Sequence, residues 1–179
     1  MKKLFFTFLA GAAILSACSQ SSEYVIFGTV SNPDLEGAKI FLVPIDNPVV
    51  ENIDSTYIKN QTFEFRGTEE KIADIRIERM KRLGTETLLV VTEPGETYVT
   101  IGAVSTSRGT AQNDSLQVWK NLTMNYSKQS RVLSQQGNKD AVKALRESYY
   151  ERTRQMASNV GKNTTLGAFL ESRVPKSAK

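Results

Sequence analysis

The sequence contains no histidine and only one cysteine among its 179 residues, and both shortages narrow the chemistry open to the protein. Without histidine there is no Ser-His or Cys-His nucleophile and no histidine-ligated metal site. One cysteine excludes an intrachain disulfide, a Cys-x-x-Cys redox pair and a cysteine-ligated zinc site. Charged residues make up 23% and aromatic residues 8% of the chain, values that are ordinary for a globular protein. We therefore expect a folded protein with no enzyme activity, no metal site and no cofactor.

The chain also lacks an apolar run long enough to span a membrane as a helix. The run at residues 4–15 has 12 residues, whereas a spanning helix needs about 20. It follows Lys2 and Lys3 and is succeeded by two small residues, directly before Cys18. A basic start, a short apolar stretch and small residues at its end are typical of a secretory signal peptide.

The segment Leu15-Ser16-Ala17-Cys18 resembles the bacterial lipobox. By that resemblance, residues 1–17 would be removed, Cys18 would carry a diacylglycerol thioether, and its new amine would be acylated. Stable anchoring takes two acyl chains, so a multiply acylated Cys18 would hold the protein at a membrane. Two other interpretations are a plain secreted protein with an incidental cysteine and an uncleaved anchor.

Residues 18–23 form a small polar tether without an acid directly after the cysteine and without a run of acids. The sorting rules of bacterial lipoproteins then imply retention at the outer membrane, facing the periplasm. We therefore expect a lipid-anchored protein of the bacterial cell envelope with a protein partner there and no nucleic-acid partner.

Residues 24–110 contain short runs rich in β-branched and aromatic residues, separated by glycine, proline and other turn residues. This pattern predicts an antiparallel β-sandwich of about seven strands. Asn60-Gln61 is expected to close a tight hairpin, and Pro94-Gly95 is expected to form a type II turn between two strands. We place the strands at residues 24–30, 38–44, 55–58, 62–66, 72–78, 87–92 and 97–101.

Residues 111–174 contain no proline, and their apolar residues recur at helical spacing. They predict two to three helices packed on the sandwich, followed by a tail at residues 175–179. A second helix is expected after Gly137 with Asn138 or Asp140 as its cap, and a third after residues 163–165. The fold class is therefore mainly β with α.

Charge divides along the same boundary. Residues 18–110 hold 9 basic and 14 acidic residues, whereas residues 111–179 hold 12 basic and 5 acidic residues. One interpretation is that the helices lie against the acidic sandwich with their remaining charges solvated. The other is a basic helical arm that binds an anionic partner or a lipid surface.

Several stretches, in this order after a lipobox, resemble one known family. The family is the unknown-function β-sandwich domain that precedes thioredoxin-like disulfide reductases in envelope lipoproteins. In that family a thioredoxin fold with a Trp-Cys-x-x-Cys site usually follows, and here the only cysteine is Cys18. The resemblance therefore implies a fold and a compartment but no activity. The matching stretches are Phe27-Gly28-Thr29-Val30, Ala38-Lys39-Ile40-Phe41-Leu42, Thr62-Phe63-Glu64-Phe65-Arg66-Gly67, Glu93-Pro94-Gly95 and Gly109-Thr110-Ala111-Gln112-Asn113-Asp114.

Three groups of polar residues are candidate sites. Glu93 and Glu96 flank a turn and are better explained as solvated acids than as a catalytic pair. Asn113 or Asp114 is expected to cap the first helix. A basic cluster is expected to protect a strand edge rather than to bind an anion. The cluster consists of Arg76, Arg79, Lys81 and Arg82.

The leading hypothesis is a non-catalytic, lipid-anchored module for protein interaction or scaffolding. One alternative is an accessory subunit that acts in trans with a thioredoxin-like reductase. Another is a sandwich that binds a small ligand or a glycan, which exposed aromatic residues lining one groove would favour. Cys18, as the lipid attachment site, is the one functional residue that these hypotheses assign.

Overall fold

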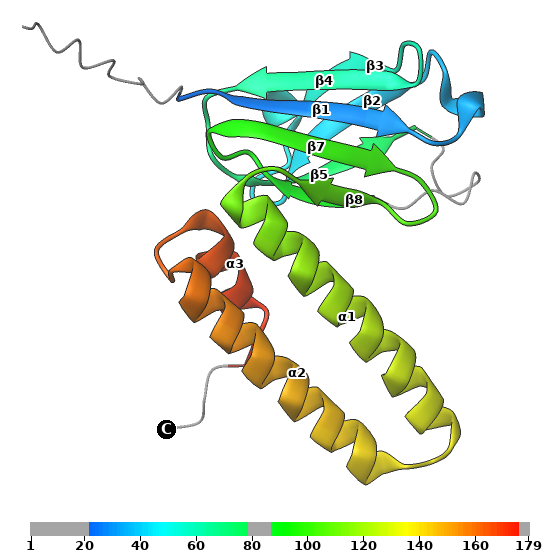
Figure 1. Cartoon of the computed structure of the whole chain (residues 1–179), viewed down its shortest axis with the longest axis vertical. Helices are drawn as coiled ribbons and strands as arrows, with labels where there is room; N and C mark the ends of the chain where they lie inside the picture. Colours follow the sequence, from blue (N-terminus) through cyan, green and yellow to red (C-terminus); the bar gives the residue numbers. More distant parts are fainter. Residues whose placement is uncertain (1–21, 79–86, 176–179) are drawn as a thin grey trace, which may run out of the picture.

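The computed structural model describes residues 22–78 and 87–175, which form a β-sandwich and a helical part (Figure 1). The predicted signal peptide, Cys18 and most of the tether lie outside the described residues. The strands are β1 Tyr24–Val30, β2 Lys39–Pro44, β3 Asp54–Tyr57, β4 Thr62–Gly67, β5 Ile72–Ile77, β6 Leu88–Val91, β7 Gly95–Ile101 and β8 Thr106–Arg108. The helices are α1 Ala111–Gln135, α2 Lys139–Val160 and α3 Thr165–Ser172.

The described strands form two four-stranded sheets, in the orders β4-β1-β7-β8 and β3-β2-β5-β6. The prediction of a sandwich is confirmed in outline, but the count of about seven strands is too low by one. The additional strand, β8, has only three residues and therefore shows too little alternation to be recognised. The prediction of purely antiparallel pairing is also wrong, because β1 and β7 are parallel neighbours.

The core of the sandwich lies between the two sheets. Along β4 the side chains alternate, with Phe63 and Phe65 buried and Thr62, Glu64 and Arg66 exposed. The Phe63 ring covers Gly28 on the neighbouring strand, where a Cβ atom would lie 2.0 Å from the ring. The largest fully buried side chains in this core are Ile26, Leu35, Ile40, Leu42, Ile58, Ile75, Leu88, Val90 and Ile101.

Two turns shape the sandwich. Asn60 and Gln61 have φ angles of 53° and 57°, as a type I′ hairpin requires, so the predicted hairpin between β3 and β4 is confirmed. The Glu36 carboxylate accepts hydrogen bonds from both of their backbone N–H groups, at 2.8 and 2.9 Å. At Pro94 the chain passes from β6 in one sheet to β7 in the other, and Gly95 has a φ of 118°.

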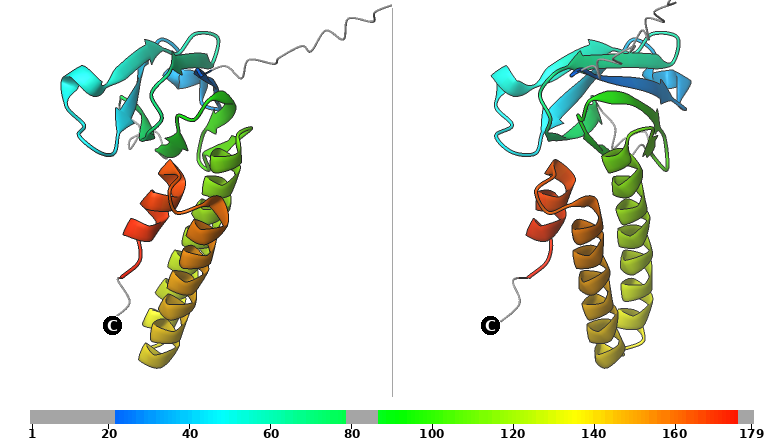
Figure 2. Two further views of the ribbon diagram at one scale, coloured as in Figure 1. Left: turned by 90° about the vertical axis from the view of Figure 1, so that its left-hand side faces the viewer. Right: turned by 60° about the vertical axis from the view of Figure 1, so that its left-hand side comes forward.

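The helices α1 and α2 form a long antiparallel hairpin that projects from one side of the sandwich (Figures 1 and 2). The short helix α3 lies beside α2 at the sandwich end of this hairpin. Asn138 caps α2, because its side chain accepts a hydrogen bond from the Ala141 N–H at 3.1 Å. Thr164 caps α3 in the same way, through the Gly167 N–H at 3.0 Å.

A second hydrophobic core joins the helices to the sandwich. Ile72 and Val91 contribute from the sheet, and Trp119 packs edge-to-face on Phe169 with ring centroids 5.6 Å apart. Ion pairs such as Arg76–Asp74 on the sandwich and Lys162–Glu171 on the helical part join residues within one part of the chain. This junction is built largely from apolar contacts. The remaining buried members of this core are Leu116, Ala157, Leu166 and Leu170.

The start of α1 is held by an acid from another segment. The helix begins at Ala111 with Thr110 as its N-cap residue, so the prediction that Asn113 or Asp114 occupies the cap position is wrong. The Glu93 carboxylate instead accepts hydrogen bonds from the N–H groups of Gln112 at 2.7 Å and Asn113 at 3.2 Å. An acid that satisfies these free N–H groups also interacts favourably with the helix dipole. Glu93 therefore has a structural role.

Asn113 is fully buried, with 0% of its surface exposed. Its side-chain oxygen accepts from the Val91 N–H at 2.9 Å, and its amide nitrogen donates to the Val91 carbonyl at 2.8 Å. The same nitrogen lies 2.8 Å from the Thr110 hydroxyl and 3.1 Å from the Thr97 hydroxyl. Because β6 is an edge strand, Asn113 supplies the hydrogen bonds that a further strand would otherwise provide.

The expectation that a basic cluster guards a strand edge is wrong for Arg76. This residue lies on β5, which is paired on both sides with β2 and β6. Its guanidinium forms an ion pair with Asp74 at 2.8 Å on the same strand. The other three members of the cluster lie outside the described residues.

Candidate functional site

A groove of about 900 Å³ runs across the sheet β4-β1-β7-β8. All four strands line it, and it extends to Tyr57 and Lys59 at one end and to Gln117 on α1 at the other. The pairing register places the outward-facing residues of these strands in rows that run across the sheet. Two adjacent rows lie in the groove.

The first row consists of four exposed threonines, one from each strand. Thr29 is paired with Thr62 on one side and with Thr100 on the other, and Thr100 is paired with Thr106. The hydroxyls of Thr29 and Thr100 lie 3.2 Å apart. Because neighbouring strands lie about 4.8 Å apart, the row presents hydroxyl groups at a regular spacing. Each hydroxyl both donates and accepts hydrogen bonds.

The second row is aromatic at its centre and charged at its ends. Phe27 is paired with Glu64 on one side and with Tyr98 on the other, and Tyr98 is paired with Arg108. The rings of Phe27 and Tyr98 stack with centroids 5.5 Å apart, and the Arg108 guanidinium lies 5.8 Å from the centre of the Tyr98 ring. Tyr98 nevertheless keeps 44% of its surface exposed. The row therefore combines apolar ring surface with one positive and one negative group.

The Tyr98 hydroxyl donates a hydrogen bond of 2.5 Å to the Glu96 carboxylate. This bond raises the pKa of the Tyr98 phenol above its ordinary value of 10.0, while the nearby Arg108 acts in the opposite direction. The phenol is therefore a neutral donor at physiological pH and keeps the ring in place beside the threonine row. The Glu96 carboxylate accepts a hydrogen bond from Tyr98, and the Glu93 carboxylate accepts one from the first turn of α1. The two acids that flank the turn therefore have separate structural partners.

Replacing Glu96 by Gln is expected to lower the pKa of the Tyr98 phenol, because the phenolate then no longer faces a carboxylate. Ionisation of Tyr98 would begin at a lower pH than in the parent protein. The measurement is the pH dependence of the Tyr98 ring signal in NMR spectra. Glu64→Gln, which changes the carboxylate that lines the groove, is the control and should leave this pKa much closer to the parent value. An unchanged Tyr98 pKa in the Glu96→Gln variant would show that the hydrogen bond does not control it.

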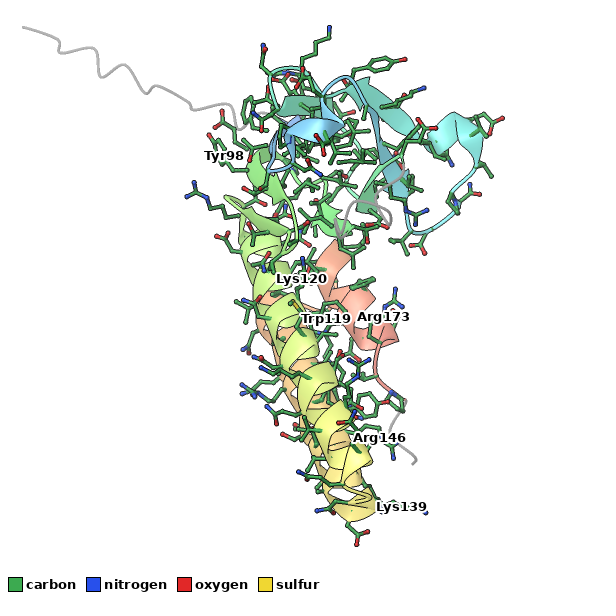
Figure 3. The ribbon with its side chains drawn as sticks, turned by 90° about the vertical axis from the view of Figure 1, so that its right-hand side faces the viewer. Tyr98, Trp119, Lys120, Lys139, Arg146 and Arg173 are labelled. Atoms are coloured by element: carbon green, nitrogen blue, oxygen red, sulfur yellow. The ribbon has the colours of Figure 1, made fainter. Side chains whose placement is uncertain are left out.

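The groove lies mainly on the sandwich, whereas most residues labelled in Figure 3 lie on the helical part. Figure 3 shows Tyr98 on the sandwich, Trp119 and Lys120 near the sandwich end of α1, and Lys139 and Arg146 toward the far end of the helical hairpin. Over residues 22–78 and 87–175, no three acidic or cysteine side chains gather closely enough to bind a metal ion. None of the helices in the described part has the apolar length required to cross a bilayer.

The comparisons with known proteins concern the same part of the chain. The family model described as Domain of unknown function (DUF4369) matches residues 24–116. This range covers the whole sandwich and the first residues of α1, more than half of the sequence. The chain belongs to this family. The resemblance to a domain of unknown function is thus confirmed, whereas its association with thioredoxin-like reductases stays a prediction. No curated protein and no solved structure matches the chain.

The DUF4369 region contains both rows of the groove and the Glu93 and Asn113 contacts that fix α1 to the sandwich. The groove was not predicted as a site, although six of the eight residues in its two rows lie on strands expected from the sequence. The alternation in Thr62-Phe63-Glu64-Phe65-Arg66 shows which side chains point outward. It does not show which outward residues of distant strands lie side by side. Cys18, the predicted lipid attachment site, lies outside the described residues.

Proposed function

We propose that this protein is a lipid-anchored, non-catalytic binding module of the bacterial cell envelope, facing the periplasm at the outer membrane. We further propose that its sandwich binds an oligosaccharide in the cross-sheet groove. The lipobox-like segment that ends in Cys18 supports the anchor. The observation that carries the ligand assignment is the row of four threonines beside the Phe27–Tyr98 stack.

An oligosaccharide matches the chemistry of both rows. Sugar hydroxyls donate and accept hydrogen bonds, as the threonine hydroxyls do, and sugar rings also have apolar C–H faces that suit aromatic rings. Arg108 and Glu64 add stronger hydrogen-bonding groups at the two ends of the aromatic row. The groove crosses four strands and is open, which suits part of a chain molecule better than a small enclosed ligand.

The position of the groove disfavours an extended peptide as its ligand. A peptide that adds to a sheet as a further strand needs an edge with free backbone N–H and C=O groups. The centre of this groove lies on β1 and β7, which are paired on both sides. Recognition there must therefore use side chains, and the side chains available are mainly hydroxyl and aromatic groups.

Replacing both Thr29 and Thr100 by Val is expected to weaken oligosaccharide binding about tenfold or more. The change removes two hydroxyls at the centre of the row, each of which is worth about 0.5–1.5 kcal/mol in a hydrogen bond. Valine has the same branched shape and favours strands, so the fold should be retained. The measurement is calorimetric titration of the mature chain, carrying Cys18→Ser to prevent lipidation, with neutral, N-acetylated and uronic-acid oligosaccharides.

The control for this experiment is Thr68→Val, which makes the same change at an exposed residue outside the groove. Tyr98→Ala should also weaken binding, because it removes the exposed ring and the contact with Phe27. If no oligosaccharide binds the parent protein, the ligand assignment is wrong. If the double variant binds as tightly as the parent, the ligand occupies another surface.

A second candidate function is protein interaction through the helical hairpin. Between α1 and α2 runs a groove of about 640 Å³ whose rim carries the amides of Asn121, Asn125, Gln129 and Asn159. Its floor includes the stacked rings of Tyr126 and Tyr149, with centroids 4.6 Å apart. A photo-reactive residue at Asn125 should then form a specific cross-link in membranes, whereas one at Glu64 should not. A thioredoxin-like reductase captured there would support the role of accessory subunit in trans.

A further inference from the structure

A third cavity, of about 280 Å³, lies where α1 meets the sandwich, next to the proposed oligosaccharide groove, with which it shares Ser107 and Gln117. Its walls are mainly apolar and come from β6 and α1. The apolar residues that line it are Leu88, Leu89, Leu116, Trp119 and Met124.

Two residues that line this cavity each carry a buried polar atom without a hydrogen-bond partner. Over the described residues, the Trp119 indole nitrogen and the Ser107 hydroxyl are two of the three buried side-chain polar atoms in that condition. Trp119 is 9% exposed and Ser107 is 3% exposed. Buried donors and acceptors are nearly always paired in folded proteins, because leaving one unpaired is costly. Two in the lining of one cavity indicate that something absent from the chain itself pairs with them.

Three other polar side chains around the cavity, those of Thr123, Gln117 and Lys120, are already engaged within the protein. The Thr123 hydroxyl donates to the Trp119 carbonyl at 2.9 Å, and the Gln117 side chain accepts from the Ser107 N–H and donates to Asn121. The Lys120 ammonium donates to the Ser105 carbonyl. The Trp119 indole N–H and the Ser107 hydroxyl are the buried polar groups of this lining that have no partner.

The size of the cavity exceeds that of a single water site. A dry engineered cavity of about 150 Å³ binds benzene, and drug-sized ligands occupy about 300–1,000 Å³. A water molecule needs two to four polar partners, whereas most of this lining is apolar. An indole N–H can only donate, so the group that pairs with it must be an acceptor.

We propose that this cavity binds a small apolar molecule that carries one carbonyl or ester oxygen. The oxygen accepts hydrogen bonds from the Trp119 indole N–H and the Ser107 hydroxyl, and the apolar body lies against the leucines and Met124. This inference stands independently of the oligosaccharide groove and of the lipid anchor.

The test uses acetophenone and ethylbenzene, which have nearly the same shape but differ in the carbonyl oxygen. Trp119 is the only tryptophan of the chain, so the mature Cys18→Ser protein gives a single indole N–H signal in a ¹H–¹⁵N NMR spectrum. Acetophenone is expected to move this signal downfield in a saturable manner. Ethylbenzene is expected to bind about threefold to tenfold more weakly, because it forms no hydrogen bond.

Two variants separate the hydrogen bond from the shape of the cavity. Ser107→Ala should weaken acetophenone binding by a similar factor and leave ethylbenzene binding unchanged. Ser127→Ala, at an exposed position of α1, is the matched control and should change neither. Trp119→Phe keeps an aromatic ring against Phe169 and removes the indole N–H, and its binding is followed by the ligand-induced rise in melting temperature.

A cavity-filling change locates the site. Leu89→Phe should reduce binding of both compounds, whereas Val118→Phe, at an exposed position of α1 that does not line this cavity, should not. The proposal is overturned if acetophenone neither moves the indole signal nor raises the melting temperature. It is equally overturned if both compounds bind alike and Ser107→Ala has no effect, or if binding survives Leu89→Phe undiminished.

Discussion

Replacing Asn113 by Ala is expected to lower the free energy of unfolding by about 3 kcal/mol. The change leaves the N–H and the C=O of Val91 buried without their partners, and each unpaired group costs about 1–3 kcal/mol. It also removes packed atoms from a site with no solvent exposure, which adds a cavity term. For a chain of this size the melting temperature should fall by roughly 6–12 °C.

Asn125→Ala provides the matched control for this prediction. Asn125 lies on the same helix but is exposed, so the gain in helix propensity from Asn to Ala is the same at both positions. The difference between the two variants in chemical denaturation then isolates the contribution of the buried amide. Equal stability of the two variants would show that Val91 finds other partners, and that Asn113 does not join α1 to the sandwich.

The role of Asn113 shows why the start of α1 was only partly predictable. The sequence Asn113-Asp114 before Leu116 and Trp119 is typical of a helix start, and a helix does begin close to it. The helix begins at Ala111, however, because Glu93 satisfies the N–H groups of Gln112 and Asn113 from outside the segment. That leaves the Asn113 side chain available for Val91. Local pattern identifies a helix terminus, but it carries no information about an acid 20 residues earlier in the chain.

The groove could not be predicted from the sequence for a similar reason, because it depends on contacts between distant segments. The alternation along each strand correctly separates outward residues such as Thr29 and Glu64 from inward ones such as Phe63. The rows arise from pairings between segments that lie far apart, above all the parallel pairing of β1 with β7. A shift of one residue in either strand would exchange the outward set for the inward set. Composition and spacing therefore predict the sheets, whereas only the register creates the site.

The charge division of the chain left two interpretations open, helices against the sandwich or a free basic arm, and α1 and α3 contact the sandwich. The centre of this junction is the apolar core around Trp119. Its polar contacts include the carboxylates of Glu93 and Glu70, which accept hydrogen bonds from Gln112, and the Asn113 amide, which pairs with Val91. The Gln112 side chain also accepts from the Leu166 N–H at 2.8 Å, which ties the start of α3 to the start of α1. The stability of such a junction should depend little on salt concentration, because screening by salt acts mainly on exposed charges.

Replacing Cys18 by Ala is expected to abolish membrane attachment of the protein. The proposed modification forms a thioether, and among side chains the thiolate is the nucleophile that this alkylation requires. Alanine has the small size that the lipobox-like segment tolerates but no sulfur, so neither lipid addition nor cleavage before residue 18 should occur. Metabolic labelling with a fatty acid should fall to background, and the product should retain residues 1–17.

Ser19→Ala is the matched control, because it changes the next residue to the same small side chain and leaves the thiol in place. Labelling and cleavage should then be those of the parent chain. With the acyl chains absent, the Cys18→Ala protein has only its uncleaved apolar run of 12 residues to hold it at a membrane. That run is short of the length for a spanning helix, so the variant should be extracted by mild washing whereas the parent needs detergent. Normal cleavage and fatty-acid labelling of Cys18→Ala would contradict the anchor and favour a plain secreted protein with an incidental cysteine.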